Sequence, residues 1–252
     1  MSGILTGKTL VVMGVANQRS IAWGCTQSLL AQGAKVILTY QNDRLKTSLE
    51  RFVGPDQALV ACDVSKDENV EAAFKEIITK YGKVDGVIHA IAYADKATLT
   101  SGLVNTTADG YALAQHISAY SFISVARYAS QVMKDGGSLV TLTYFGSERA
   151  IPNYNMMGVA KASLEASVRY LASDLGAANI RVNAISAGAV KTLAVTGIKN
   201  HGTLLKMSRD RTVDGKSVET SEIGNTAAFL LSDLSTGITG DIIYVDKGVH
   251  LM

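Results

Sequence analysis

Short runs of β-branched and other apolar residues recur along the chain, separated by longer stretches of mixed character. Seven such runs stand out, at residues 9–14, 35–40, 58–63, 84–92, 138–144, 180–186 and 241–246. Polar residues rarely interrupt them, which is the pattern of strands buried on both faces of a sheet rather than on one face. We expect each run to form one strand.

The segments between these runs place apolar residues at helical spacing. They include residues 21–32, 68–81, 113–133 and 163–175. Strands that alternate with helices predict a parallel sheet covered on both faces. The predicted fold class is therefore α/β, with residues 1–252 forming a single doubly wound, Rossmann-like domain around a seven-stranded parallel sheet.

One segment breaks the alternation between the sixth and seventh predicted strands. Residues 190–217 carry glycines and charges and are longer than an ordinary connection in a compact domain. The segment follows the carboxyl end of a strand, the edge at which open α/β sheets bind ligands. We expect residues 190–217 to form a substrate-binding lid insertion.

Composition narrows the possible functions. The chain has 24 Lys plus Arg against 22 Asp plus Glu, a net charge of +2 that lacks the basic excess of a nucleic-acid-binding protein. Cys25 and Cys62 show neither zinc-ligand spacing nor a disulfide framework, so we expect no metal. No signal-peptide pattern opens the chain, and no apolar run reaches about 18 residues. We expect a cytoplasmic protein that binds neither nucleic acid nor membrane.

The turn after the first predicted strand is suited to a phosphate group. Gly14 ends the strand, and Ser20 stands where the cap of the next helix is expected, directly before Ile21. A helix start offers free N–H groups and a positive dipole end to a pyrophosphate. The full GxGxxG pattern is absent, and Gly followed by a Ser cap is also ordinary turn chemistry. The place of this turn, first in a Rossmann-like chain, favours a dinucleotide.

Polar side chains at the ends of the second and third strands suit the rest of a dinucleotide. Gln41 stands where an acidic residue commonly binds the ribose of NAD, and the nearest arginine, Arg44, is three residues on. Without an arginine for a 2′-phosphate, the sequence favours NAD(H) over NADP(H). Asp63 can accept from the adenine amino group, or cap the helix expected near Lys66. Small residues at 90–92 permit close approach of a ligand.

A tyrosine and a lysine follow the fifth predicted strand. Tyr154 lies seven residues before Lys161 and shortly after Pro152, so it falls at or just before a helix start. Residues seven apart lie on nearly the same face of a helix, about 10 Å apart along its axis, so their side chains point toward the same region. A phenol and an ammonium stabilise negative charge that develops on an oxygen as hydride arrives, and the ammonium lowers the pKa of the phenol. A packing tyrosine and a surface lysine are the alternative.

The motifs support a resemblance that covers most of the chain. It resembles the short-chain dehydrogenase/reductase superfamily, and within it the NADH-dependent enoyl-acyl carrier protein reductases of bacterial type II fatty-acid synthesis. The matching stretches are VVMGVANQRSIAWG, TYQND, DV at 63–64, SLVTLTYFGSERAIPNYNMMGVAKASLEASVRYLASDLG and IRVNAISAGAVKTLA. Most of the superfamily places tyrosine four residues before the lysine, where this chain has Met157, and a serine upstream, where it has Tyr144.

The resemblance implies an oxidoreductase that acts on a CH–CH group. It would reduce trans-2-enoyl thioesters to saturated acyl thioesters, the last reductive step of the fatty-acid elongation cycle. Hydride would reach the β-carbon, Tyr154 would stabilise the enolate, and the α-carbon would then be protonated while residues 190–217 order over the acyl chain. The seven-residue spacing suits this reaction, because the enolate oxygen is not on the carbon that receives hydride.

The same resemblance assigns roles to individual residues. Tyr154 and Lys161 would be catalytic, with Lys161 fixing the nicotinamide ribose; Tyr144 would line the substrate pocket or, alternatively, pack beneath the lid. Contacts to NADH/NAD+ are expected from Gly14, Ser20, Ile21, Gln41, Asp63, Val64, Ile91, Lys161, Val190 and Thr192.

The implied partner is an acyl carrier protein that carries the enoyl substrate, and the implied assembly is a homotetramer. The carrier is acidic, and the basic residues of the insertion are candidates to contact it, namely Lys199, Lys206, Arg209 and Arg211. A cluster of charges is also typical of an ordinary solvated surface. The chain departs from the family's usual residues at Ala90, Ala92, Ala189 and Lys247, and Lys247 replaces a common glycine.

Two other functions stay open. A 3-oxoacyl or other carbonyl reductase would share the fold and the cofactor, but Met157 opposes it. A regulator that binds NAD without catalysis would share the cofactor site alone, and the retained Tyr154 and Lys161 oppose that.

Overall fold

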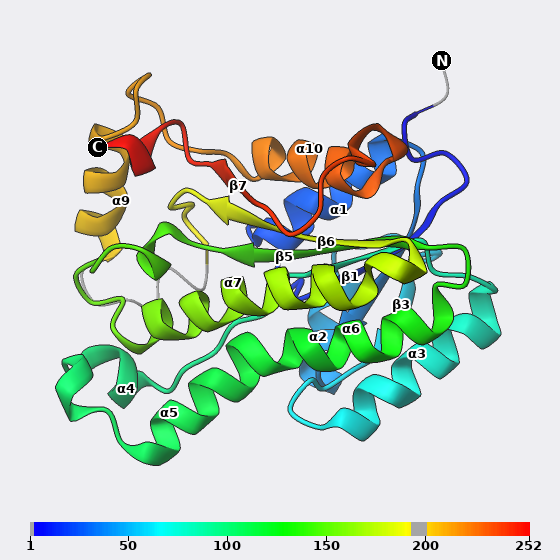
Figure 1. The fold of residues 1–252 in the computed structure, drawn as a ribbon, viewed down its shortest axis with the longest axis horizontal. Coiled ribbons are helices and arrows are strands. Elements are labelled where there is room, and N and C mark those ends of the chain that lie inside the picture. The colour runs from blue at the N-terminus through cyan, green and yellow to red at the C-terminus, as the bar shows by residue number, and fades with distance from the viewer. Residues whose placement is uncertain (1–2, 193–200) are drawn as a thin grey trace.

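The described part of the chain, residues 3–192 and 201–252 of a computed structural model, builds a parallel sheet of seven strands with helices on both sides (Figure 1). The strands are β1 (Thr9–Met13), β2 (Lys35–Tyr40), β3 (Ala58–Ala61), β4 (Gly86–His89), β5 (Gly137–Thr143), β6 (Ile180–Ala187) and β7 (Ile242–Val245). They lie in the order β3-β2-β1-β4-β5-β6-β7, and each neighbouring pair is parallel. The predicted fold class is confirmed.

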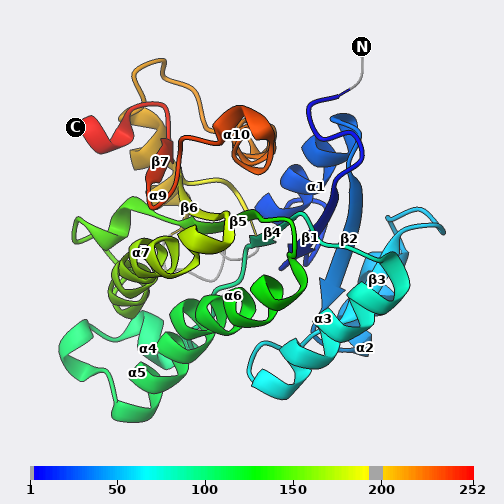
Figure 2. The same cartoon turned by 45° about the vertical axis from the view of Figure 1, so that its right-hand side comes forward.

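The helices form a layer on each face of the sheet (Figure 2). One layer holds α3 (Asp67–Tyr81), α6 (Ser121–Val132) and α7 (Met156–Leu175). The other holds α1 (Ile21–Ala31) and α10 (Thr220–Leu231), which pack on each other, and α2 (Asp43–Glu50), whose Leu49 joins the same core. Further helices are α4 (Lys96–Thr100), α5 (Ala108–Gln115) and α9 (His201–Asp210), with a π-helical turn at His116–Tyr120 and 3₁₀ turns at Leu103–Asn105, Phe145–Ser147, Gly176–Ala178, Asp233–Ser235 and Val249–Leu251.

The central strands supply side chains to both layers. Successive residues of a strand point to opposite faces, so Leu139 of β5 joins the core under α3, α6 and α7, and Val140 joins the core under α1 and α10. Both are fully buried. This double burial explains why the strands read as unbroken apolar runs.

Several predicted boundaries differ from those in the structure. The strands predicted at 58–63 and 84–92 are shorter, because their last residues leave the sheet at its edge. The helix predicted at 113–133 is α5, the π-turn and α6 in succession. A π-turn adds one residue to a helical turn without changing the apolar character, so periodicity alone does not detect it. The predicted lid contains α9, and its residues 193–200 lie outside the described residues.

The strand order reverses beside β1. From β1 the chain proceeds outward to β2 and β3, and then returns to place β4 on the other side of β1. In doubly wound sheets such a reversal opens a crevice at the carboxyl ends of the strands. In Figure 1 these ends lie at the left, with α9 above and α4 below. Within the described chain, no helix combines the length and the apolar character needed to cross a membrane.

Candidate active site

The predicted site residues gather at the carboxyl edge of the sheet. Because all strands run parallel, the residues that follow them meet at one edge. Six predicted site residues lie within three residues after the ends of β1 to β6: Gly14, Gln41, Asp63, Ile91, Tyr144 and Val190. Lys161 and Tyr154 reach the same edge from α7 and the turn before it.

The turn after β1 has the close backbone approach expected of a dinucleotide site. Gly14 has φ +95°, and a Cβ added there would lie 2.1 Å from the carbonyl oxygen of Ala90. A larger residue would therefore separate β1 from β4 at the point where the strand order reverses. Ser20 is the N-cap of α1, accepts from the N–H of Trp23 at 3.3 Å and donates to the carbonyl of Asn17 at 2.7 Å. Ile21 begins the helix and packs on the core.

The predicted ribose and adenine residues are in contact with each other. The Gln41 side-chain amide donates to Oδ1 of Asp63 at 3.3 Å, and the same oxygen accepts from the N–H of Ser65. The alternative role of Asp63 as a helix cap is wrong, because Lys66 is the N-cap of α3 and no side chain caps it. Val64 is buried in the core beneath. The Asp63 carboxylate thus lies beside Gln41, across the edge from Gly14.

The remaining predicted cofactor residues are apolar or buried. Ile91 packs against the core of the α3–α6–α7 layer, and its Cγ1 would lie 3.3 Å from a Cβ at Gly14. Val190 packs against the opposite core. Thr192 is buried, and its N–H donates to the carbonyl of Val190 at 2.8 Å. These residues follow β4 and β6 at the carboxyl edge of the sheet.

Tyr154 lies in a tight turn, two residues before α7 begins. The two asparagines that flank it both adopt positive φ, Asn153 at 64° and Asn155 at 43°, a region that asparagine tolerates better than most residues. The Asn155 amide donates to the carbonyls of Leu99 and Ser101, at 2.8 and 2.9 Å, and so ties the turn to α4. The position just before the helix agrees with the prediction from Pro152.

The phenol of Tyr154 faces Tyr144. Their rings meet edge to face, 4.9 Å apart at 73°. Gly146 allows this packing, since a Cβ there would lie 2.5 Å from the Tyr154 ring. Burial raises the pKa of the Tyr154 phenol, and the neighbouring Tyr144 and Glu165 raise it further. The prediction that Lys161 lowers this pKa is therefore wrong for the protein alone, and the phenol stays protonated as a hydrogen-bond donor.

Lys161 is a buried lysine, with 6% of its surface exposed. Its ammonium donates to the carbonyl of Leu142, on β5, at 2.7 Å. Burial lowers its pKa from 10.5 to about 8, against an upward influence from Glu165. An uncharged His89 lies nearby, because burial and then Lys161 lower the pKa of that imidazole to about 3. The alternative of a surface lysine is excluded by this burial.

Two residues of the site, His89 and Glu165, were not among the predicted site residues. His89 ends β4 and bonds Thr141 and Ser121 through its two ring nitrogens, at 3.1 and 2.8 Å. Glu165 follows Lys161 by one helical turn and accepts from Thr143 at 2.5 Å. A charged residue four positions after the lysine, on the inward face of an apolar helix, was the available signal for Glu165.

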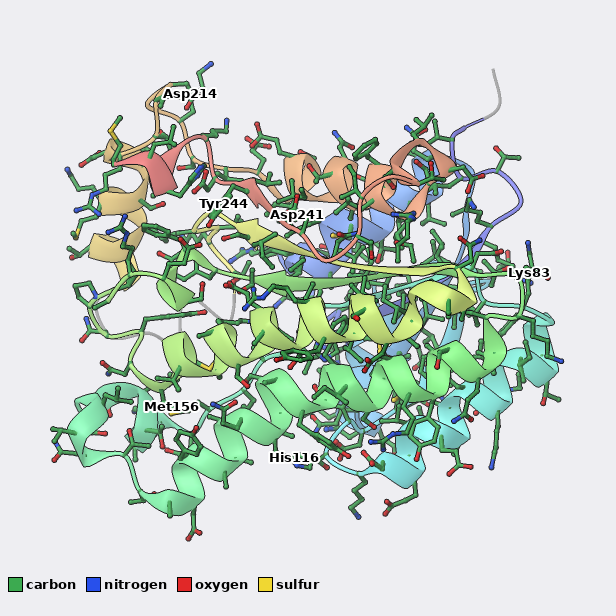
Figure 3. The ribbon with its side chains drawn as sticks, viewed as in Figure 1. Lys83, His116, Met156, Asp214, Asp241 and Tyr244 are labelled. Carbon is green, nitrogen blue, oxygen red and sulfur yellow. The ribbon has the colours of Figure 1, made fainter. Side chains whose placement is uncertain are left out.

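Met157 lies where most of the superfamily has its tyrosine. It is buried in a small cluster with Ala94, Ala114 and Met156, against which Tyr154 packs. In Figure 3 Met156 marks this cluster, between the start of α7 and α4. Met157 is therefore a core residue that fills the place of the usual phenol.

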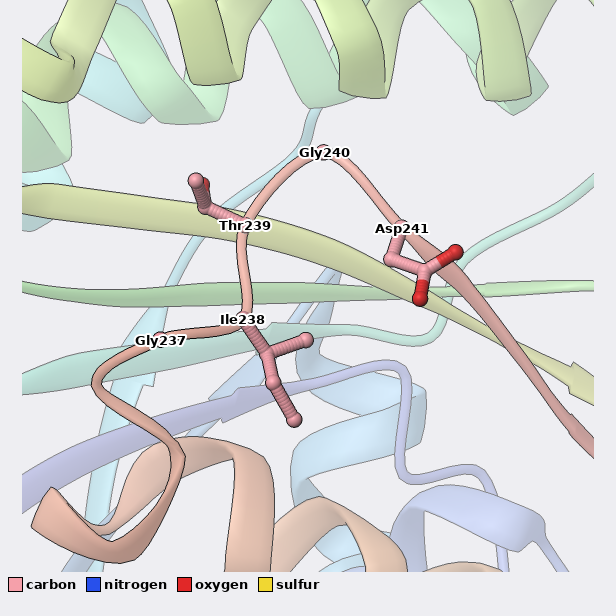
Figure 4. A pocket seen from close by; sticks show the side chains of 5 residues that line it. All are labelled: Gly237, Ile238, Thr239, Gly240 and Asp241. Carbon is pink, nitrogen blue, oxygen red and sulfur yellow. The ribbon is translucent and has the colours of Figure 1, made fainter.

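Two surface hollows lie at the opposite edge of the sheet. One, of about 320 Å³, follows the turn Gly237–Asp241 at the amino end of β7 (Figure 4). The other, of about 970 Å³, is bordered by Lys35 and Ala58, the first residues of β2 and β3. The described residues that line them include none of the predicted site residues, so neither hollow belongs to the carboxyl edge.

Known proteins match this chain along nearly its whole length, including all the residues at the carboxyl edge of the sheet. A family model described as enoyl-(acyl carrier protein) reductase matches residues 14–250. The enoyl-[acyl-carrier-protein] reductase [NADH] FabI of Enterococcus faecalis is 56% identical over 247 residues, 98% of this chain and 99% of that protein. The crystal structure of the Bacillus cereus enoyl-acyl carrier protein reductase with NADP+ and indole naphthyridinone has a TM-score of 0.95 and 48% identity, covering 99% of each chain. The Anaplasma phagocytophilum enoyl-(acyl-carrier-protein) reductase in complex with NAD has a TM-score of 0.94 and 42% identity, covering 100% of this chain and 97% of that one.

Proposed function

This chain belongs to the enoyl-(acyl carrier protein) reductase family, and from that membership we propose how its residues reduce an enoyl thioester. The protein is an oxidoreductase that uses NADH to reduce trans-2-enoyl thioesters to saturated acyl thioesters. The observation that carries the residue assignment is the buried Lys161 seven residues after a protonated Tyr154, both at the carboxyl edge of the sheet.

NADH fits the residues along this edge. Gly14 allows the turn after β1 to pack against Ala90, and the α1 start that follows this turn offers N–H donors for the pyrophosphate. Asp63 would accept from the adenine amino group, and Gln41 would lie against the ribose next to it. Ile91 and Val190 would border the nicotinamide from opposite sides. When bound, NADH supplies the hydride for the β-carbon.

Tyr154 would stabilise the enolate oxygen. Negative charge develops on the thioester oxygen as the β-carbon is reduced, and a neutral phenol in a dry site is a strong donor toward it. The edge-to-face contact with Tyr144 and the two flanking asparagines hold the phenol in one orientation. The oxygen that needs stabilising is not on the carbon that is reduced, which suits a phenol moved away from position 157.

Lys161 would hold the nicotinamide ribose and add positive charge near the enolate. Its ammonium donates a hydrogen bond to the Leu142 carbonyl, near the end of β5 at the carboxyl edge of the sheet. A protonated lysine has three donors, so two stay available for ribose hydroxyls while one bonds that carbonyl. A lysine with a pKa near 8 is charged at neutral pH.

The lid and the carrier contact belong to this proposal. Residues 190–217 would cover the acyl chain, and the basic residues of α9 would face the acidic carrier. Lys206 and Arg209 each lie within ion-pair distance of Asp210, and Lys199 lies outside the described residues. Arg211 lies near enough to Tyr144 to lower its pKa against burial, which brings the end of the lid to the site. The homotetramer stays a prediction.

The test is NADH consumption by the purified protein, with trans-2-enoyl and 3-oxoacyl thioesters offered in parallel. We expect rapid loss of NADH absorbance with the enoyl substrate and none with the 3-oxoacyl substrate. NADPH, offered as a second donor, measures how strict the cofactor preference is. Oxidation only with the 3-oxoacyl substrate would overturn the assignment of Tyr154, and binding of NADH without turnover of either would favour a regulator.

A further inference from the structure

A second buried charge lies next to the proposed catalytic pair. Glu165 has 7% of its surface exposed and lies on the inward face of α7, four residues after Lys161. Carboxylates are seldom buried to this degree without a partner, because a charged group that leaves water loses favourable hydration. The mechanism above gives Glu165 no role.

Lys161 and Glu165 form hydrogen bonds with consecutive residues of β5. The Lys161 ammonium donates to the carbonyl of Leu142 at 2.7 Å, and the hydroxyl of Thr143 donates to Glu165 Oε1 at 2.5 Å. Residues four apart on a helix share one face, so both side chains reach from that face of α7 to the end of the same strand. Thr143 is itself buried and therefore fixes the carboxylate in place.

We propose that Glu165 is a positioning residue for the reaction, whose carboxylate, held by Thr143, keeps the Lys161 side chain charged and directed at the sheet edge. The inference rests on the proposed function of Lys161. A lysine surrounded by apolar atoms tends to lose its proton, and a fixed negative charge one turn away opposes that loss. The lysine would then keep its donors for the ribose hydroxyls at neutral pH.

The other titratable groups around Lys161 do not replace this carboxylate. His89 on β4 is uncharged above pH 5, because burial holds its pKa at about 3. Burial likewise raises the pKa of Tyr144, Tyr154 and Tyr244, which stay neutral. Glu148 is bonded to the Tyr244 hydroxyl, and Asp246 to His250. Glu165 is the charged group that acts on the pKa of Lys161.

The test is the pH dependence of NADH affinity, measured by fluorescence titration of the folded protein from pH 6 to 10. In the parent, affinity should fall as pH rises past about 8, where Lys161 loses its proton. Glu165→Gln keeps the size of the side chain and removes its charge. In this variant we expect NADH affinity to fall at a pH roughly one unit lower than in the parent. Glu165→Asp should restore most of the parent profile.

Matched variants separate this role from a structural one. Asp174→Asn removes an exposed carboxylate from the same helix and should leave the profile unmoved. Thr143→Val keeps the charge of Glu165 and removes the hydroxyl that holds its carboxylate. It should therefore shift the pH profile of NADH affinity less than Glu165→Gln does. The proposal is overturned if NADH affinity in Glu165→Gln falls at the same pH as in the parent, or if it is reduced equally at every pH. Since NADH binding is measured without turnover, absence of enoyl reduction would refute the proposed function separately.

Discussion

At the scale of single residues, the proposed roles need one group that stays neutral, Tyr154, and one that stays charged, Lys161. Tyr154 and Lys161 are both buried, yet burial acts on them in opposite senses: it keeps the proton on the phenol and loosens the proton on the ammonium. A neutral donor and a cation at the same edge of the sheet suit a developing enolate. The chemistry therefore follows from the environment as much as from the residue types.

The phenol can be tested by removing its hydroxyl alone. Tyr154→Phe keeps the ring against Tyr144 and Gly146, so the fold of the turn should persist. Loss of one donor to an oxyanion typically costs about 100-fold or more in turnover, and we expect that drop in kcat for the enoyl thioester. The dissociation constant for NADH, from fluorescence titration, should change less than about threefold. Tyr170→Phe, at an exposed tyrosine, is the control, and full activity in Tyr154→Phe would show that another group holds the enolate.

The buried lysine should lower the stability of the protein without ligand. Its pKa falls from 10.5 to about 8 on folding, so between these pH values the unfolded chain binds a proton that the folded chain does not. Stability therefore rises with pH across that window, and below pH 8 the full cost of burial persists. Lys161→Met removes the cost but also the bond to Leu142, and we expect a net gain of about 1–2 kcal/mol at pH 7.

Urea unfolding at pH 7 and pH 10 measures this gain. The difference between Lys161→Met and the parent should shrink at pH 10, because the parent recovers stability as its lysine deprotonates. Lys134→Met, at an exposed lysine, should stay within about 0.5 kcal/mol of the parent at both pH values. A less stable Lys161→Met protein at pH 7 would show that its hydrogen bond outweighs its burial.

At the scale of elements, the strands and the cofactor turn could be predicted from sequence, and the irregular segments could not. Seven apolar runs predicted the seven strands, because burial on both faces of a sheet leaves short, unbroken apolar runs between turn residues. Gly14 was predicted from its place at the end of the first strand, and the structure adds a second reason for a glycine there, the close approach of Ala90. The π-turn at His116–Tyr120 and the helix α9 inside the insertion left no such pattern.

Within the site, residues at strand ends were predictable and their contacts were not. The position of Gln41 and Asp63 after two neighbouring strands follows from parallel topology, but their mutual hydrogen bond depends on side-chain orientation. Glu165 and His89 act through three-dimensional neighbours, Thr143, Thr141 and Ser121, that lie 20 or more residues away. Periodicity reports which face a residue occupies, and not what it meets there.

Lys247, which replaces a glycine common in the family, ties the end of the insertion to the loop after β7. It adopts φ 54°, its ammonium lies 3.3 Å from Asp214 and 3.0 Å from Glu222, and its carbonyl accepts from Val213 at 3.0 Å. In Figure 3 Asp214 marks the segment that joins α9 to α10. The ion pairs bring the insertion, α10 and the chain end together.

Replacing this lysine should loosen the insertion with little effect on global stability. Lys247→Gly relieves the positive φ and loses the ion pairs, which offset each other to within about 1 kcal/mol. Hydrogen exchange of the Val213 amide and of the α9 amides should nevertheless quicken about 3- to 10-fold. Asp214→Asn should act similarly, and combining the two should add little. Unchanged exchange in both variants would mean that the ion pairs do not hold the insertion.

The basic face of α9 offers a test of the carrier contact. Lys206→Glu with Arg209→Glu reverses two charges on an exposed helix that is far in sequence from Tyr154 and Lys161. An acidic carrier should then be repelled, so KM for the carrier-linked enoyl substrate should rise about 10-fold, by loss of steering and contact. KM for the coenzyme A analogue should stay within about twofold. Equal changes for both substrates would remove α9 from the carrier contact.

At the scale of the whole molecule, the two cores share one sheet, which predicts a single cooperative domain over residues 1–252. Leu139 and Val140 are adjacent on β5, and each is fully buried in a different core. The only tryptophan, Trp23, packs against Phe52 in the α1–α10 core, so its fluorescence reports on that face alone. A substitution in the opposite core is therefore a test of coupling across the sheet.

Leu139→Ala leaves a cavity beneath α3, α6 and α7, on the face away from Trp23. Truncating a buried leucine costs about 2–5 kcal/mol. Because β5 cannot lose its packing on one face and keep its place on the other, the urea midpoint seen by Trp23 fluorescence should fall together with the midpoint seen by circular dichroism. Val140→Ala, on the Trp23 face, should behave alike with a smaller shift. If Leu139→Ala moved the circular dichroism midpoint and left the Trp23 midpoint in place, the two layers would unfold separately, and the sheet would not bind them into one domain.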